Sequence, residues 1–132
     1  MVRLDLEGGD LAVLRLLPPY GPQDEADYLA ALEQVARIDH PFVLLALFGG
    51  GPALSRTGDR EQALWFKRTR AHMEATCRGC AMVRPGASEA SAATFRRLWS
   101  FPIHATQDEA DARAFLAALR PSTAGTSPER EA

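Results

Sequence analysis

The chain has 132 residues, 46% of them hydrophobic and 24% charged, which is enough for one hydrophobic core but short for two. A formal net charge of −2 without runs of Lys or Arg disfavours nucleic acid as a partner, and no stretch reaches the roughly 18 apolar residues of a membrane span. Because the start also lacks an export signal, we expect a cytoplasmic protein whose two cysteines form no structural disulfide.

The first forty residues predict a β-hairpin followed by a helix. Apolar and polar residues alternate over residues 2–7, and after a Gly-Gly-Asp turn a second apolar run covers residues 11–17. A segment rich in proline then interrupts the chain. The acidic residues Asp24, Glu25 and Asp27 suit the positive N-terminal end of a helix, which should run to about Ile38.

The middle of the chain predicts a buried strand and a long helix. Residues 41–48 form a continuous apolar run, which is typical of a central parallel strand covered on both faces. Glycines end this run, and an amphipathic helix should begin near Asp59. Gly79 is expected to end that helix in the left-handed conformation, and residues 80–83 should form a short strand.

The remaining residues predict two more helices with a strand between them. One helix should begin at about Ser88, and the strand should cover residues 101–105. Thr106 and Glu109 have the spacing of a capping box, which places the last helix from Gln107 to Leu119.

The order of elements is therefore ββαβαβαβα. It predicts an α/β fold with a mixed sheet of about five strands, in which the N-terminal hairpin is followed by parallel strands, and with four helices. Residues 1–120 are expected to form a single domain. Residues 121–132 are rich in Ser, Thr, Pro and Glu, and we expect them to be a disordered tail.

Several segments resemble the STAS-like superfamily, in particular its branch of bacterial proteins similar to the sporulation anti-sigma-factor antagonist. They are the hairpin, the helical residues 63–73, the strand 81–83, and the segments 95–103 and 108–116. The resemblance implies a STAS-like fold and a non-enzymatic binding or regulatory module, whose partner is another protein or a second copy of the chain.

The resemblance also implies a regulatory phosphorylation site in the loop after the central strand. Ser55 and Thr57 lie in this loop, and Arg56 and Arg60 supply positive charge for a phosphate or another anion. The loop departs from the Asp-Ser-Ser-Gly-like pattern of the family, because glycines follow the strand directly. Serine and threonine in such a loop also serve as turn or cap residues.

An alternative function is the binding of an apolar small molecule or a lipid in a cleft between helices and sheet. Trp65, Phe66, Phe95 and Trp99 recur at helical spacing. They are expected either to fill the core or to line such a cleft.

A third interpretation, a thiol redox protein, depends on Cys77 and Cys80. Because a helix C-terminus disfavours a thiolate, we expect structural thiols, with a pKa of Cys77 at or above the free value of about 8.5. His40, His72 and His104 have no metal-ligand spacing with them, and no nucleophile, base and orienting group occur together. We therefore expect no enzyme activity, no metal and no cofactor.

The charge distribution suggests self-association. Residues 1–40 hold three Arg and eight acidic residues, whereas residues 59–99 hold eight Arg or Lys and four acidic residues. Leu64 falls on the polar side of the long predicted helix. These features predict a homodimer that uses the surface around Leu64.

Overall fold

The computed structural model describes residues 1–121 and has the predicted order of elements. The elements are β1 (Val2–Glu7), β2 (Leu11–Leu16), α1 (Asp24–Ala36), β3 (Phe42–Phe48), α2 (Arg56–Thr76), β4 (Cys77–Val83), α3 (Glu89–Arg96), β5 (Ile103–Thr106) and α4 (Glu109–Ala117). No helix in the described part of the chain is long and apolar enough to span a membrane. Apart from Pro121, the predicted tail lies outside the described residues.

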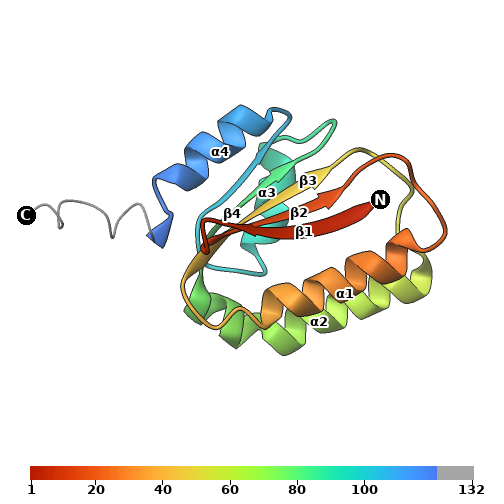
Figure 1. The fold of residues 1–132 in the computed structure, drawn as a ribbon, viewed down its shortest axis with the longest axis horizontal. Coiled ribbons are helices and arrows are strands. Elements are labelled where there is room, and N and C mark those ends of the chain that lie inside the picture. The colour runs from red at the N-terminus through yellow and green to blue at the C-terminus, as the bar shows by residue number, and fades with distance from the viewer. Residues whose placement is uncertain (122–132) are drawn as a thin grey trace, which may run out of the picture.

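The five strands form one mixed sheet in the order β1-β2-β3-β4-β5, which confirms the predicted fold class. Strands β1 and β2 are antiparallel, and each later strand pairs parallel with the one before it. Because the parallel strands advance in one direction, right-handed crossovers place α1, α2 and α3 on the same face of the sheet. Helix α4 covers the other face, opposite α1 and α2 (Figure 1).

Strand β3 is the centre of the sheet and has core on both faces, as its apolar run predicts. Successive residues of a strand point to opposite faces. Phe42, Leu44 and Ala46 contribute to the larger core beneath α1, α2 and α3. The residues between them contribute to the smaller core under α4, which holds Val43, Leu45 and Leu47.

Helix α2 begins and ends earlier than the sequence predicts. It begins at Arg56 instead of Asp59, because the Ser55 side chain caps it by accepting a hydrogen bond from the Gly58 N–H at 3.0 Å. Its C-terminal residue is Thr76, and the chain enters β4 directly at Cys77. The predicted left-handed cap at Gly79 is therefore wrong, since Gly79 lies inside β4.

The capping box predicted for the last helix is also wrong. Thr106 still belongs to β5, where it pairs with Val83, so it is not available as the cap. Asp108 takes that place, and its carboxylate accepts from the Asp111 N–H at 3.1 Å. Thr106 Oγ1 accepts from the Asp108 N–H at 3.1 Å and so supports the cap.

Candidate functional site

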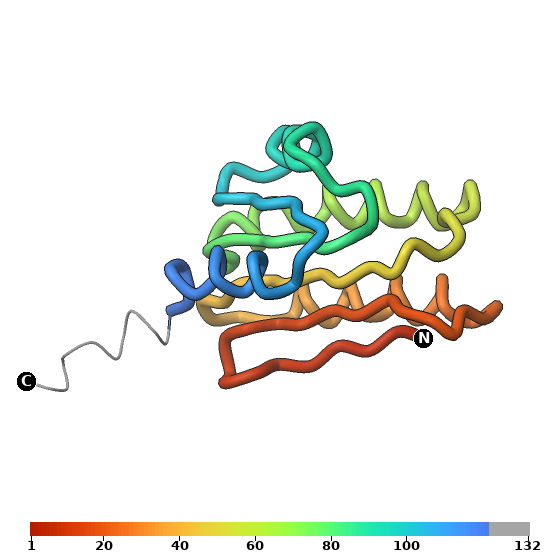
Figure 2. Tube along the Cα trace, turned by 90° about the horizontal axis from the view of Figure 1, so that it is seen from above, coloured from red at the N-terminus to blue at the C-terminus, as the bar shows by residue number. Residues whose placement is uncertain are grey.

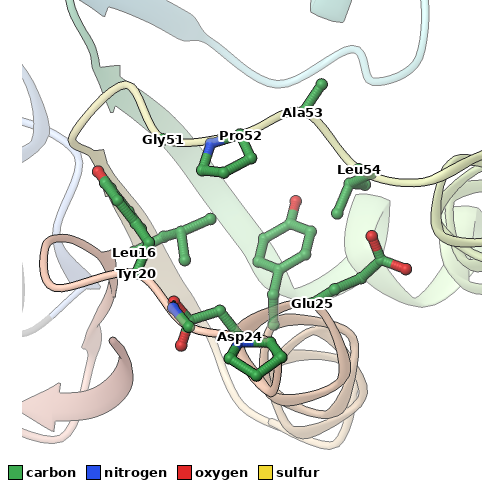
Figure 3. Close-up of a pocket in the computed structure, with 11 residues that line it drawn as sticks. Leu16, Tyr20, Asp24, Glu25, Gly51, Pro52, Ala53 and Leu54 are labelled. Carbon is green, nitrogen blue, oxygen red and sulfur yellow. The ribbon is translucent and has the colours of Figure 1, made fainter.

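A cavity of about 370 Å³ opens beside the C-terminal ends of β2 and β3. Ligands of α/β proteins bind outside this edge of a sheet, where the loops after parallel strands meet. Figure 3 shows Gly51, Pro52, Ala53 and Leu54 of the β3–α2 loop along one side, with Asp24 and Glu25 of α1 opposite them. The complete lining is Leu16, Tyr20, Gly21, Pro22, Asp24, Glu25, Tyr28, Gly51, Pro52, Ala53 and Leu54.

The glycines after β3 allow the two loops of this cavity to approach each other. A Cβ atom at Gly49 would lie 2.4 Å from the Tyr20 hydroxyl, and one at Gly51 would lie 2.6 Å from the Tyr20 ring. Gly50 has a φ of +84°, which L side chains rarely adopt. The glycines therefore do more than end the strand, because their lack of a side chain lets the Tyr20 ring pack against the loop.

The two carboxylates of the cavity have different partners. Asp24 Oδ2 accepts from the Met1 amino group at 2.8 Å and from the Gly21 N–H at 2.9 Å, and these bonds lower its pKa. Glu25 accepts from the Ser55 hydroxyl at 2.6 Å and the Ser55 N–H at 2.7 Å, which lowers its pKa as well. The negative charge of Asp24 is thus balanced by the Met1 amino group, whereas the donors to the Glu25 carboxylate are neutral.

Two tyrosines form apolar walls with polar ends. The Tyr28 hydroxyl donates to Gln62 Oε1 at 2.5 Å, and burial raises its pKa to about 12, so the phenol is neutral at pH 7. The buried Tyr20 hydroxyl has no hydrogen-bond partner within residues 1–121. A buried polar group without a partner is costly, and this hydroxyl lies close to Gly49, where a Cβ atom would be 2.4 Å away.

The residues predicted to bind an anion lie at the edge of this site. Ser55 is the N-cap of α2, and Arg56, Thr57 and Arg60 are exposed on its first turns. The N-terminus of a helix attracts anions, but the Glu25 carboxylate already occupies this position next to Ser55. Phosphorylation of Ser55 or Thr57 stays a prediction.

The four aromatic residues predicted as an apolar pocket pack on one another between α2, α3 and the sheet. Phe66 lies 5.3 Å from Trp65, 6.1 Å from Phe95 and 5.0 Å from Trp99, measured between ring centroids. Trp65 and Trp99 are buried, and their indole N–H groups have no partner within the described residues. None of the four lines the cavity at β2 and β3, and their role as a ligand pocket stays a prediction.

Both cysteines are buried in the larger core as free thiols. Burial raises the pKa of Cys77 to about 12, in the direction expected from the sequence, and it also raises the pKa of Cys80. This environment opposes the thiolate that redox chemistry requires. Residues 1–121 contain no group of three His, Cys, Asp or Glu side chains placed to hold a metal ion.

Comparison with protein-family models, with curated proteins and with solved structures found no match. The STAS-like resemblance therefore stays a prediction, and the cavity is interpreted from its own chemistry. Its central residues, Leu16, Tyr20, Tyr28 and Leu54, were not predicted from the sequence. A signal was present, because Pro- and Gly-rich loops follow two strands that were predicted to be parallel neighbours, and such loops meet at one edge of a sheet.

Proposed function

We propose that this chain is a non-enzymatic binding module that holds a small, mainly apolar ligand in the cavity at the C-terminal ends of β2 and β3. The observation that supports the proposal is the cavity itself, a hollow of about 370 Å³ walled by Leu16, Tyr20, Tyr28 and Leu54. Small-molecule sites are typically concave and apolar, with a few polar groups that orient the ligand. The STAS-like resemblance and the expected cytoplasmic location are compatible with such a module.

The charges at the cavity favour a ligand that carries an amine. None of the described lining residues is Lys or Arg, and the Asp24 carboxylate is already paired with the Met1 amino group. The Glu25 carboxylate has only neutral donors from Ser55, so a cation placed in the cavity gains an attraction that an anion would oppose. The ligand class is therefore an apolar body, aromatic or aliphatic, with one amino group.

The geometry also supports a regulatory use of this binding. Glu25 lines the cavity and at the same time joins the start of α1 to the cap of α2 through Ser55. An amine that draws the Glu25 carboxylate toward the cavity weakens this connection. Ligand binding is thereby coupled to the N-terminal turn of α2, which is the surface that a protein partner would contact.

Calorimetric titration with a matched pair of probes tests the proposed ligand class. The probes are 2-phenylethylamine and 3-phenylpropanoate, which share a phenyl ring on a two-carbon linker but carry opposite charges. We expect the amine to bind with millimolar Kd, as befits a fragment, and about tenfold more tightly than the carboxylate. Equal affinities, a preference for the carboxylate, or no heat from either probe at about 10 mM would contradict the proposal.

A further inference from the structure

We propose that β1 pairs antiparallel with β1 of a second copy of this chain, so that the two sheets join across a two-fold axis. Strand β1 is the first in the sheet order and follows the outer margin of the molecule (Figure 2). An edge strand presents a row of backbone donors and acceptors that can pair with another strand. This inference is independent of the ligand proposed for the cavity.

The backbone of β1 shows which residues face outward along the sheet. The Leu17 N–H donates to the Met1 C=O at 2.9 Å, which makes Met1 and Leu17 a hydrogen-bonded pair of the β1–β2 ladder. Such pairs alternate along an antiparallel ladder. The N–H and C=O groups of Val2, Leu4 and Leu6 therefore point away from β2 and are aligned for a further strand.

The side chains of β1 are self-complementary when a two-fold axis passes through Leu4. Val2 then lies opposite Leu6 of the second copy, and Arg3 lies opposite Asp5 of the second copy. The even-numbered residues form the hydrogen-bonded pairs, and the Arg3–Asp5 pairs fall at the intervening positions, where cross-strand side chains are closest. Shifting the register by two residues places Arg3 against Arg3 or Asp5 against Asp5, which is unfavourable.

The surface around β1 has room for the second copy. A groove of about 320 Å³ runs between β1 and α1, where the helix contributes Asp27, Ala30 and Gln34. Leu6 is 46% exposed although it lies on the same face of β1 as Val2 and Leu4, which pack against the core. Pairing covers Leu6 with Val2 of the second copy, which gives this apolar side chain a partner.

Charged residues of β1 are also placed to pair between copies. The Arg3 side chain is 67% exposed and that of Asp5 is 35% exposed, and within one chain they are joined at 2.9 Å. Such an exposed pair contributes little by itself. Across the axis the same two side chains form two further pairs, so they set the register of the interface more than its affinity.

Sedimentation of the full chain tests this proposal. At about 50 μM, where a dimer of micromolar Kd is largely formed, we expect twice the 14.4 kDa mass of the chain. Arg3→Glu and Asp5→Lys each place like charges across the axis and should weaken the dimer about tenfold or more. The double variant Arg3→Glu/Asp5→Lys restores opposite charges both within the chain and across the axis and should restore the dimer. An equimolar mixture of the two single variants restores opposite charges across the axis alone and should also form a dimer, a rescue that restored stability of β1 within one chain does not produce.

Leu64→Glu is the matched control, because Leu64 is 50% exposed, similar to Leu6, but lies on α2 and not in β1. This variant should leave the dimer intact. A monomeric wild-type protein at the same concentration overturns the proposal, as does a double variant that stays monomeric. Dissociation by Leu64→Glu, with the β1 variants still dimeric, overturns it in favour of the α2 surface.

Discussion

Aromatic side chains gather at two places on the same face of the sheet, and they fill the space differently. Between α2 and α3, the rings of Trp65, Phe66 and Trp99 lie with centroids 5.0 to 6.1 Å apart and form part of the core. Beside α1, Tyr20 and Tyr28 stand around a cavity of about 370 Å³. The same kind of side chain therefore closes one space and leaves the other open.

The segments that meet the rings explain this difference. The α2–α3 region is closed by further aromatic rings, because Phe66 also meets Phe95 and Trp99 stacks on Phe101 at 5.0 Å. The region beside α1 is closed by the loop of residues 51–54, in which Leu54 alone supplies a large apolar side chain. An apolar face becomes core or binding site according to the volume that the opposing segment supplies.

Removing a ring from the filled region should have the largest effect. Trp65 is 2% exposed, so Trp65→Ala should lower the free energy of unfolding by about 3 to 5 kcal/mol. Urea unfolding followed by circular dichroism measures this change. Leu64→Ala at the exposed neighbouring position is the control and should stay within about 0.5 kcal/mol of the wild type. A small effect of Trp65→Ala would show that this region is not tightly packed.

Filling the open region should affect binding more than stability. Leu54 points into the cavity, whereas Ala53, although it also lines the cavity, directs its Cβ away from it (Figure 3). Leu54→Trp should therefore weaken binding of 2-phenylethylamine about tenfold, whereas Ala53→Trp should leave it unchanged. Calorimetric titration of both variants compares the same added ring on the two sides of one loop. Equal losses in the two variants would mean that the ligand does not occupy the cavity.

Disrupting the connection between the two regions should have the smallest effect. Ser55→Ala removes the cap of α2 and one donor to Glu25, and it should cost about 1 kcal/mol at pH 7. Thr57→Ala is the control on the same turn, with an expected change within about 0.5 kcal/mol.

The effect of Ser55→Ala should also depend on pH. The Ser55 bonds lower the pKa of Glu25 below its usual 4.5, so their stabilisation is complete above that value and is lost as the pH falls through the lowered pKa. The difference between wild type and Ser55→Ala in urea unfolding should therefore narrow in acid. A difference that stays constant down to about pH 2 would show that Ser55 acts only as a cap.

The elements of the fold could be predicted because their signals are local. The apolar run of β3 predicts burial on both faces, and the alternation in β1 predicts a strand of a hairpin; the structure confirms both predictions. Helix ends were harder, because several residues compete for one cap. Ser55 and Asp108 are the caps in the structure. Ser55 contacts Glu25, which is distant in the sequence, and Asp108 contacts the nearby Asp111.

The cavity could not be predicted from periodicity. Its walls come from β2, the β2–α1 loop, α1 and the β3–α2 loop, so the unfilled volume arises only when these segments are placed together. The rings at Trp65 and Trp99 have the same helical spacing whether they fill a core or line a cleft. The glycines at 49–51 were visible in the sequence, but their contact with Tyr20 depends on the path of the preceding loop.

Backbone and indole chemical shifts during titration with 2-phenylethylamine test the central claim most directly. The chain has two tryptophans, so the indole N–H signals of Trp65 and Trp99 report separately on the filled region. We expect shifts at Tyr20, Gly51 and Leu54, with both indole signals unchanged. Shifts of the indole signals with none at Gly51 and Leu54 would place the ligand among the aromatic rings of α2 and α3 and would contradict the account.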